Sequence, residues 1–226
     1  RDQPRSRGLG DVYKRQRYGR VYVLLTHLHA DHAGSLASLM SYTHCVLKIQ
    51  VTVVHPVDTV VRMLALQGIA PDFYRYQPAL DEDCPVSARP VEVPHAQDMR
   101  AFGYVITGEG ETVYFSGDSA ILPDEVAQGY LEGKIARLYH DTASHESAGH
   151  CCYRRLAERI PPEKRAGVNC MHLDGDYAGM LREMGFPGYR CDWRKAPGRP
   201  DVAFVGRKLA IEIRGCFWHR CPVCSL

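Results

Sequence analysis

The stretch Thr26–Leu36, "THLHADHAGSL", places three histidines and one aspartate within six residues, directly after a short apolar run that predicts a buried strand. Two imidazoles at positions i and i+2 of an extended backbone point to the same side, so His27 and His29 can share one metal ion. The chain then turns, and Asp31 with His32 would face a second ion. The alternative is a polar loop with a helix cap, but this density of ligands at one strand end favours a metal site.

The composition is that of a globular protein with one large or two small domains: 226 residues, 45% hydrophobic and 24% charged. No apolar run approaches the roughly 18 residues of a membrane span, and the start lacks the apolar core of a secretory signal. We therefore expect a cytoplasmic protein without a membrane partner. Nine cysteines, two of them adjacent at Cys151 and Cys152, argue against a disulfide framework and fit a reducing compartment.

The charge is unevenly distributed. The net charge of +2 divides into +3 for residues 1–16, −6 for residues 17–181 and +5 for residues 182–226. The basic tail is the part that a polyanion such as DNA would bind first. Residues 1–16 show no apolar periodicity, and Asp11–Gln16, "DVYKRQ", resembles the in-frame translation of a sequencing adapter. We expect this segment to be such an artefact or a disordered native tail, without function in either case.

Strands interleaved with helices predict the α/β class. Gly34–Thr43, Pro56–Leu66 and Tyr153–Ile160 have helical spacing. Short β-rich runs predict the strands, namely Val21–Thr26, Gln50–His55, Phe102–Thr107, Thr112–Ser116, Ala136–Tyr139, Val168–Met171, Asp201–Val205 and Lys208–Ile213.

The motif of the opening stretch resembles that of the metallo-β-lactamase superfamily, and later motifs of that family follow in order. They are "EVPHAQDMRAFGYVI" with His95, "VYFSGDS" with Asp118 and "NCMHLD" with His172. The resemblance covers about residues 17–175, within a domain expected at residues 17–178, and implies an αββα sandwich of two mixed sheets flanked by helices. The strands that the family places before its first histidine strand have no counterpart here, so we expect the sandwich to lack its N-terminal strands.

The same resemblance implies a dinuclear centre. Its first site would consist of His27, His29 and His95, its second of Asp31, His32 and His172, with Asp118 bridging the two ions. Such nitrogen and oxygen ligands suit two zinc ions, with manganese or iron as alternatives. A metal-dependent hydrolase of phosphodiesters, including RNA, is the function that this resemblance implies.

The segment "LYHDTASHESAGH" resembles the His-Glu element of the tRNA 3′-processing branch of this superfamily. In that role His140 would protonate the leaving oxygen, and Asp141 would orient its ring. The alternative is a structural histidine at position 140. His145 and His150 are expected at the surface.

About residues 182–226, within a fragment expected at residues 179–226, resemble the central part of the very short patch repair endonucleases. This resemblance implies a partial restriction-endonuclease-like α/β fragment. The matching pieces are "PGRPD", a β-hairpin and "GCFWHR" followed by further cysteines. By that resemblance Asp201 would bind magnesium, His219 would assist the chemistry, and Phe217 with Trp218 would wedge between DNA bases. A structural zinc would be held by the three cysteines Cys216, Cys221 and Cys224.

Three functions therefore stay open. The first is a dinuclear metallohydrolase acting on a phosphodiester. The second is DNA nicking at mismatches, with the acidic body as a fused accessory. The third is an inactive chimera of two gene fragments joined near residues 174–184, because the family resemblance changes there and both parts are incomplete. The oligomeric state does not follow from the sequence.

Overall fold

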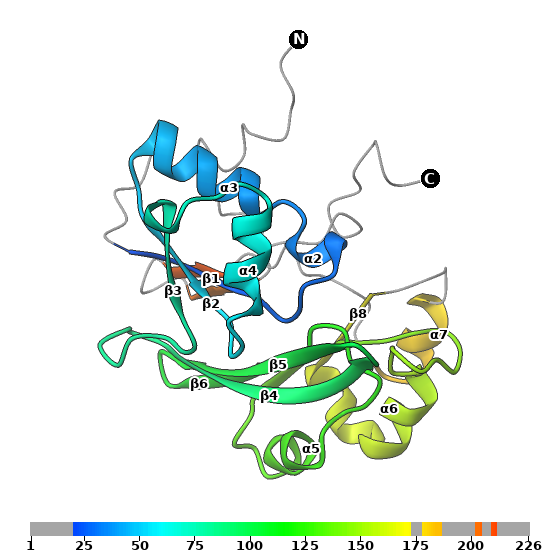
Figure 1. The fold of residues 1–226 in the computed structure, drawn as a ribbon. Coiled ribbons are helices and arrows are strands. Elements are labelled where there is room, and N and C mark those ends of the chain that lie inside the picture. Colours follow the sequence, from blue (N-terminus) through cyan, green and yellow to red (C-terminus); the bar gives the residue numbers. More distant parts are fainter. Residues whose placement is uncertain (1–19, 173–177, 187–201, 205–208, 212–226) are drawn as a thin grey trace. The chain divides into compact units, whose positions relative to one another are not determined.

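The computed structural model describes residues 20–172, 178–186, 202–204 and 209–211. These belong to two compact units, one made of residues 1–80 with 191–226 and the other of residues 81–190, and each unit is described by itself (Figure 1). The helices and strands alternate along the chain, which confirms the predicted α/β class.

The first unit is built on a three-stranded parallel sheet in the order β1-β2-β3. The strands are β1 (Val21–Leu24), β2 (Val51–Val54) and β3 (Tyr74–Gln77). The helices are α2 (Ala30–Ala33), α3 (Leu36–Tyr42), the π-helical turn η1 (Thr43–Leu47), α4 (Thr59–Leu66) and the short η2 (Pro71–Phe73).

The core of this unit follows from its apolar periodicity. Every residue of β2 is buried, as expected for a central strand of a parallel sheet covered by helices. Met40 of α3 and Val60 and Leu64 of α4 are fully buried and belong to the same cluster as β2. The predicted strands and helices of this region are confirmed, whereas β3 was not predicted.

The second unit contains a five-stranded mixed sheet in the order β4-β5-β6-β7-β8. Its strands are β4 (Ser87–Ala96), β5 (Met99–Gly108), β6 (Glu111–Phe115), β7 (Arg137–Asp141) and β8 (Val168–Met171). The first three strands are antiparallel, and β7 and β8 join β6 in parallel. Its helices are α5 (Asp124–Leu131), α6 (Tyr153–Arg159), η3 (Pro162–Gly167) and α7 (Ala178–Glu183).

The helices of the second unit pack on its sheet around one apolar core. Val126 of α5, Leu156 of α6 and Leu138 of β7 are all fully buried in this core. Leu181 of α7 and Phe186, which follows α7, are buried in it as well. The compact unit therefore includes α7 and Phe186.

The C-terminal hairpin is present as predicted. Strands β9 (Val202–Phe204) and β10 (Leu209–Ile211) form an antiparallel pair. In the described part of the chain, no helix is long and apolar enough to cross a membrane.

Candidate metal centre

The first group of candidate ligands, the N-terminal histidine cluster, consists of His27, His29 and His32 on the segment that follows β1. Nε2 of His27 and Nδ1 of His29 lie 3.0 Å apart, and their rings stand at 82° to each other. The ring of His32 lies 4.1 Å from that of His27, measured between centroids. His27 is completely buried, with its Nδ1 beside the hydroxyl of Thr26 at 3.1 Å.

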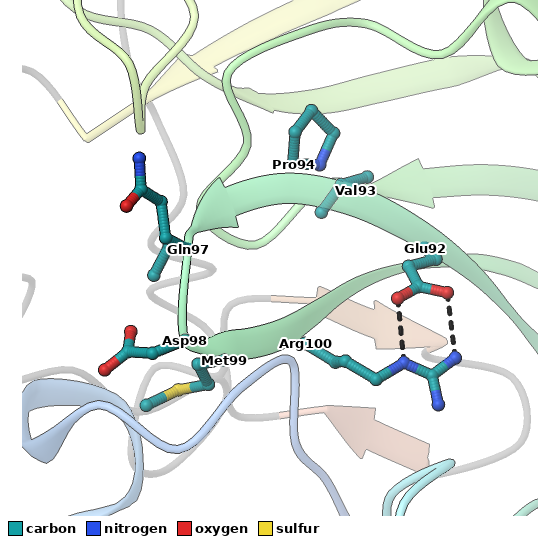
Figure 2. A pocket seen from close by; sticks show the side chains of 8 residues that line it. Glu92, Val93, Pro94, Gln97, Asp98, Met99 and Arg100 are labelled. Carbon is teal, nitrogen blue, oxygen red and sulfur yellow. Dashed lines mark hydrogen bonds and ion pairs between the residues drawn. The ribbon is translucent and has the colours of Figure 1, made fainter.

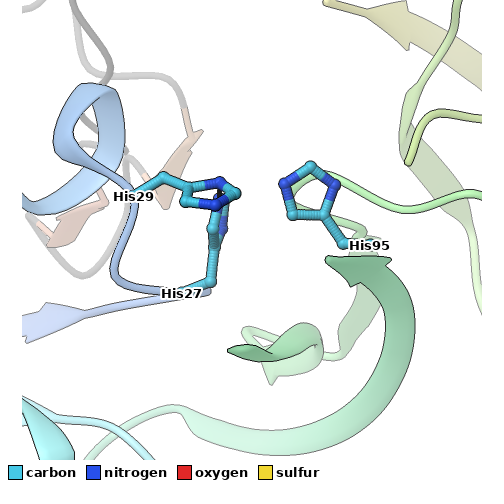
Figure 3. A group of neighbouring side chains, drawn as sticks. All are labelled: His27, His29 and His95. Carbon is cyan, nitrogen blue, oxygen red and sulfur yellow. Dashed lines mark hydrogen bonds between the residues drawn. The ribbon is translucent and has the colours of Figure 1, made fainter. Parts of the chain in front are cut away.

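This geometry suits a shared ion. Two ligands that each lie about 2.0–2.1 Å from one tetrahedral zinc ion are themselves about 3.3–3.4 Å apart. The His27 and His29 nitrogens, at 3.0 Å, need to separate by only a few tenths of an ångström to share an ion. The Asp31 carboxylate lies 3.6 Å from Nε2 of His32 and is half exposed. Figure 3 draws the His27 and His29 rings on the segment after β1, together with His95 at the end of β4.

The second group of candidate ligands belongs to the sheet of the second unit, and we call it the β4–β8 cluster. Its members are His95, Asp118, Asp141, His150 and His172. Asp118, Asp141 and His172 follow or end the strands β6, β7 and β8. Parallel strands bring their carboxyl ends to one edge of a sheet, and this explains why residues distant in sequence meet here.

The β4–β8 cluster contains two overlapping sets of ligand atoms. In the first set, one ligand atom each of His95, Asp118 and His150 lie within 4.8 Å of one another. In the second set, the same holds for Asp141, His150 and His172. Because imidazole nitrogen with carboxylate oxygen is a donor set that zinc accepts, the residues present fit a divalent metal ion.

His95 is oriented by a main-chain contact. Its Nδ1 donates a hydrogen bond to the carbonyl oxygen of Gly149 at 2.8 Å, and its Nε2 lies 3.7 Å from the Asp118 carboxylate. A carbonyl can only accept, so Nδ1 carries a proton, and in the neutral ring this leaves the lone pair on Nε2. This is the arrangement in which a metal-binding histidine donates its second nitrogen to a carbonyl.

Asp141 is a fully buried carboxylate held by several donors. Its Oδ2 accepts hydrogen bonds from the main-chain N–H of Ser119 at 2.9 Å and from Nδ1 of His150 at 2.8 Å. Its Oδ1 lies 3.6 Å from Nδ1 of His172 and accepts no hydrogen bond from a described residue. A buried carboxylate oxygen without a donor is costly, which makes it a fitting place for a cation.

His172 carries backbone strain. Its φ is +54°, in the left-handed region that a residue other than glycine rarely adopts. Its ring stacks on that of His150 at 4.3 Å and 9°. Strain of this kind persists where the surrounding structure holds a residue in place, and it concentrates at functional sites.

The histidine that the sequence analysis missed is His150. It belongs to both sets of the β4–β8 cluster, although it was expected at the surface. The loop that carries it is closed by two main-chain hydrogen bonds just after β7. The N–H of Ala143 donates to the carbonyl of Cys151, and the N–H of Tyr153 donates to the carbonyl of Ala143. The signal in the sequence was a histidine a few residues after a strand that ends in a carboxylate.

His140 lies outside both sets and is fully buried. Its Nδ1 lies 2.7 Å from the carbonyl oxygen of Asp141, and its Nε2 lies 3.2 Å from that of Ile121. Burial lowers the pKa of His140, while these carbonyl contacts and the Asp141 charge oppose the shift. Both nitrogens therefore face the main chain, and Asp141 turns its carboxylate toward His150.

A hollow of about 560 Å³ lies on the β4–β5 hairpin. Figure 2 shows Gln97 and Asp98 at its turn, and Arg100 joined to Glu92 by two hydrogen bonds of 2.8 Å. This ion pair lowers the pKa of Glu92 through the hydrogen bonds from Arg100. No ligand of the β4–β8 cluster lines the hollow, so it is not part of the candidate centre.

The residues predicted for a DNA-nicking site lie outside the described residues. They are Asp201, Cys216, Phe217, Trp218, His219, Cys221 and Cys224.

Comparison with known proteins places this geometry in a family. Residues 14–139 match the family model described as β-lactamase superfamily domain, which is more than half of the chain. The chain belongs to the β-lactamase superfamily. This membership supports the predicted class of metal-dependent hydrolase, and the described His/Asp groups fit a divalent metal ion.

Solved structures agree on the fold of this superfamily member. The metallo-β-lactamase fold protein YhfI from Bacillus subtilis is 19% identical, with a TM-score of 0.55 over 73% of this chain and 70% of that one. A diphosphatase of the PhnP family is 16% identical, with a TM-score of 0.55 over 75% of this chain and 67% of that one. Zn²⁺-bound PqqB from Methylobacterium extorquens is 13% identical, with a TM-score of 0.55 over 74% of this chain and 70% of that one. The predicted metallo-β-lactamase-like fold is confirmed.

The C-terminal segment is similar to a different group of proteins. Residues 177–224 match the family model of the DNA mismatch endonuclease Vsr. The nicking enzyme V.XorIIP of Xanthomonas oryzae is 30% identical over 70 residues, which are 28% of this chain and 51% of that protein. V.NaeI of Lentzea aerocolonigenes is 58% identical over 24 residues, which are 11% of this chain and 14% of that protein. The chain thus spans about half the length of the first relative and a smaller share of the second.

Proposed function

We propose that this chain is a dinuclear metal-dependent phosphodiesterase, with RNA among its substrates. The observation that carries the proposal is the hydrogen bond between the buried Asp141 carboxylate and His150, inside a cluster that also holds His95 and Asp118. A carboxylate that fixes one ring nitrogen leaves the other facing the substrate, which is how a proton donor is prepared.

The proposed ligands are those that the family resemblance implies. His27, His29 and His95 would hold the first ion, Asp31, His32 and His172 would hold the second, and Asp118 would contribute to both. The 3.0 Å spacing of the His27 and His29 nitrogens and the proton on Nδ1 of His95 support this set. Imidazole and carboxylate ligands favour zinc, with manganese or iron as alternatives.

Two bound ions would supply electrophilic charge at the phosphoryl oxygens and lower the pKa of the attacking water. The protein's own contribution is to hold a proton where the leaving oxygen departs. Asp141 accepts the proton of His150 Nδ1 in a hydrogen bond and stabilises the doubly protonated ring. Nε2 of that imidazolium then gives its proton to the leaving oxygen and leaves a neutral ring. Ser119 fixes the carboxylate by donating its main-chain N–H at 2.9 Å.

We assign the proton transfer to His150 in place of His140. His140 is enclosed, and each of its nitrogens is next to a main-chain carbonyl oxygen. His150 is partly exposed, with a quarter of its side-chain surface accessible. A group that gives a proton to a substrate must reach it, which only His150 of the two can do.

Two observations support a phosphodiester substrate, namely the fold and the proton donor His150. A phosphodiester has a poor leaving group, so its hydrolysis gains from a proton donor as well as from two ions. The diphosphatase of the PhnP family has the same fold, which supports chemistry at a phosphoryl group here. RNA is the polymer that the resemblance of residues 138–150 to the tRNA 3′-processing branch implies.

The test is hydrolysis of bis(p-nitrophenyl) phosphate and of a short RNA by zinc- or manganese-loaded protein. Asp118→Ala should abolish hydrolysis and reduce the metal bound per chain. Retention of full activity by this variant would refute the proposed centre.

A leaving-group series tests the role of His150. His150→Ala should lower kcat about 10²–10⁴-fold for an alkyl leaving group and much less for p-nitrophenol, which departs without a proton. Metal content should stay the same. Equal losses with both leaving groups, together with lost metal, would make His150 a ligand.

Residues 179–226 support a second candidate function, the nicking of mismatched DNA. The support is the match to the Vsr model and to two nicking enzymes. We propose that Asp201 binds magnesium, that His219 assists the chemistry, that Phe217 and Trp218 contact bases, and that Cys216, Cys221 and Cys224 bind a structural zinc. The third possibility, an inactive chimera, predicts neither activity.

A nicking assay on mismatched duplex DNA with magnesium separates these functions. Asp201→Ala should abolish nicking without changing phosphodiester hydrolysis, and Asp118→Ala should do the reverse. No nick by the wild-type chain would argue against the second function.

A further inference from the structure

Gly149 lies where two groups of the β4–β8 cluster are oriented at once. Its carbonyl oxygen accepts a hydrogen bond from Nδ1 of His95 at 2.8 Å, and the next residue, His150, donates from its Nδ1 to Asp141 at 2.8 Å. One dipeptide thus sets the direction of the His95 ring through its main chain and carries the His150 ring on its side chain.

The position also requires a residue without a side chain. A Cβ at Gly149 would lie 3.1 Å from the carbonyl oxygen of His95 and 3.3 Å from its Nδ1. Separations of 3.0–3.4 Å are tighter than nine in ten real Cβ contacts, so His95 or the loop would have to shift. The neighbour at 3.1 Å is main chain of β4, which cannot rotate away as a flexible side chain can.

The loop itself has little freedom to absorb that shift. Ala143 donates its main-chain N–H to Cys151 at 2.8 Å, and Tyr153 donates to Ala143 at 3.0 Å, so the loop is closed at its base. Within the loop the main-chain N–H of Gly149 donates to the Ser147 hydroxyl at 3.2 Å. A displacement at Gly149 is therefore transmitted to the contact between its carbonyl and His95.

We propose that Gly149 is a positioning residue of the metal centre. Its carbonyl holds His95 in the tautomer that presents Nε2 to the ion, and its missing side chain lets the His150 loop approach β4. The inference rests on the proposed function for its metal centre, but not on any particular substrate. Gly149 touches neither ion nor substrate and acts through His95 and His150.

The first experiment needs no variant. Two-bond ¹H–¹⁵N spectra of the metal-free protein report which nitrogen of each histidine ring carries the proton. His95 should show a protonated Nδ1 and a bare Nε2. The opposite tautomer in the folded wild type would overturn the proposal.

The second experiment compares Gly149→Ala with Gly129→Ala. Gly129 lies within α5, where a Cβ would meet only the Ile135 side chain, at 3.3 Å, so this variant controls for the added methyl group. Zinc affinity, measured by competition with a chromophoric chelator, should fall about 10–100-fold in Gly149→Ala and stay unchanged in the control. Metal affinity that is the same in both variants would overturn the proposal.

The outcomes distinguish the inference from the function on which it rests. If the wild type binds zinc in the expected tautomer but cleaves no phosphodiester, the proposed substrate class fails and the role of Gly149 stands. If the wild type binds no metal, both fail. If Gly149→Ala does not fold, the tautomer of the wild type still decides.

Discussion

Tyr114 places a phenol hydroxyl in the apolar core of the second unit. It is fully buried in the core of the second unit, and its hydroxyl has no hydrogen-bond partner among the described residues. Burial raises the pKa of this phenol well above its ordinary value, with a smaller effect of Glu125 in the same direction. The hydroxyl also occupies the space into which a Cβ at Gly103 would project, which accounts for the glycine there.

Removing that hydroxyl should stabilise the protein. A buried hydroxyl without a partner costs about 1–3 kcal/mol, so Tyr114→Phe should raise the free energy of unfolding by roughly 1 kcal/mol. Chemical denaturation followed by circular dichroism measures the change. The matched variant Tyr130→Phe removes a hydroxyl that donates to the Lys164 carbonyl and should lower stability instead. A loss of stability in Tyr114→Phe would show that its hydroxyl has a partner.

His140 should make the stability of the metal-free protein depend on pH. Burial lowers its pKa in the folded state, so below the unfolded value of about 6.5 the unfolded chain binds a proton that the folded chain does not. Stability contributed by the neutral ring is present above that value and is lost as the pH falls toward the folded pKa, by up to about 1.4 kcal/mol per pH unit.

The substitution His140→Gln keeps donors for the main-chain carbonyls but does not titrate. Denaturation midpoints measured in chelator between pH 5 and 7.5 should therefore fall less steeply with decreasing pH in this variant than in the wild type. His145→Gln, at an exposed histidine of the same unit, should leave the slope unchanged. Parallel slopes for His140→Gln and the wild type would contradict a lowered pKa.

At the scale of elements, Arg165 joins three parts of the second unit. Its guanidinium donates to the carbonyls of Ile160 at 2.9 Å, Ala157 at 2.8 Å and Met184 at 2.9 Å, and it lies over the Phe186 ring at 5.3 Å. These contacts fasten the end of α6 to the segment after α7. The planar guanidinium can do this because its five N–H donors point in different directions. The compact ammonium of a lysine cannot reach three carbonyls so far apart.

Arg165→Lys should consequently destabilise the protein by about 1–3 kcal/mol, because two or more main-chain carbonyls lose a charged donor. The control is Arg100→Lys, which alters an exposed ion pair with Glu92 and should cost about 0–1 kcal/mol. Urea denaturation of both variants measures the difference. Equal losses would mean that the charge of Arg165 matters and its shape does not.

The elements also show how far sequence reasoning reaches. Apolar runs that end in a ligand predicted β1, β7 and β8, because buried parallel strands are short and continuous in hydrophobicity. β4 was missed since Pro90 and Pro94 interrupt its pattern, which an edge strand tolerates because one side needs no ladder donors.

The candidate ligands were predictable where they follow a strand and not where they come from a loop. His95, Asp118 and His172 stand at strand ends, where the sequence motif marks them. His150 was not predicted as a candidate ligand because its place depends on a loop whose path is set by main-chain bonds between Ala143, Cys151 and Tyr153. Such bonds leave no periodicity in the sequence.

At the scale of the whole molecule, the ligand set that the family resemblance implies includes residues of both compact units. His27, His29 and His32 belong to the unit of residues 1–80, and the β4–β8 cluster belongs to the unit of residues 81–190. A ligand that binds only the native state stabilises it by about 2.7 kcal/mol at one hundred times its dissociation constant. If one ion is bound by both units, that stabilisation reaches each of them.

Hydrogen exchange tests this coupling directly. Zinc should slow the exchange of amides in β2 of the first unit as well as in β6 of the second. His95→Ala changes a residue of the second unit. If both units hold one ion, this variant should remove the zinc-dependent protection of β2, because the ion loses one of its ligands. His145→Ala, at an exposed histidine near the same loop, should leave the protection intact. Protection of β2 that survives His95→Ala would mean that the N-terminal histidine cluster binds its ion without the second unit.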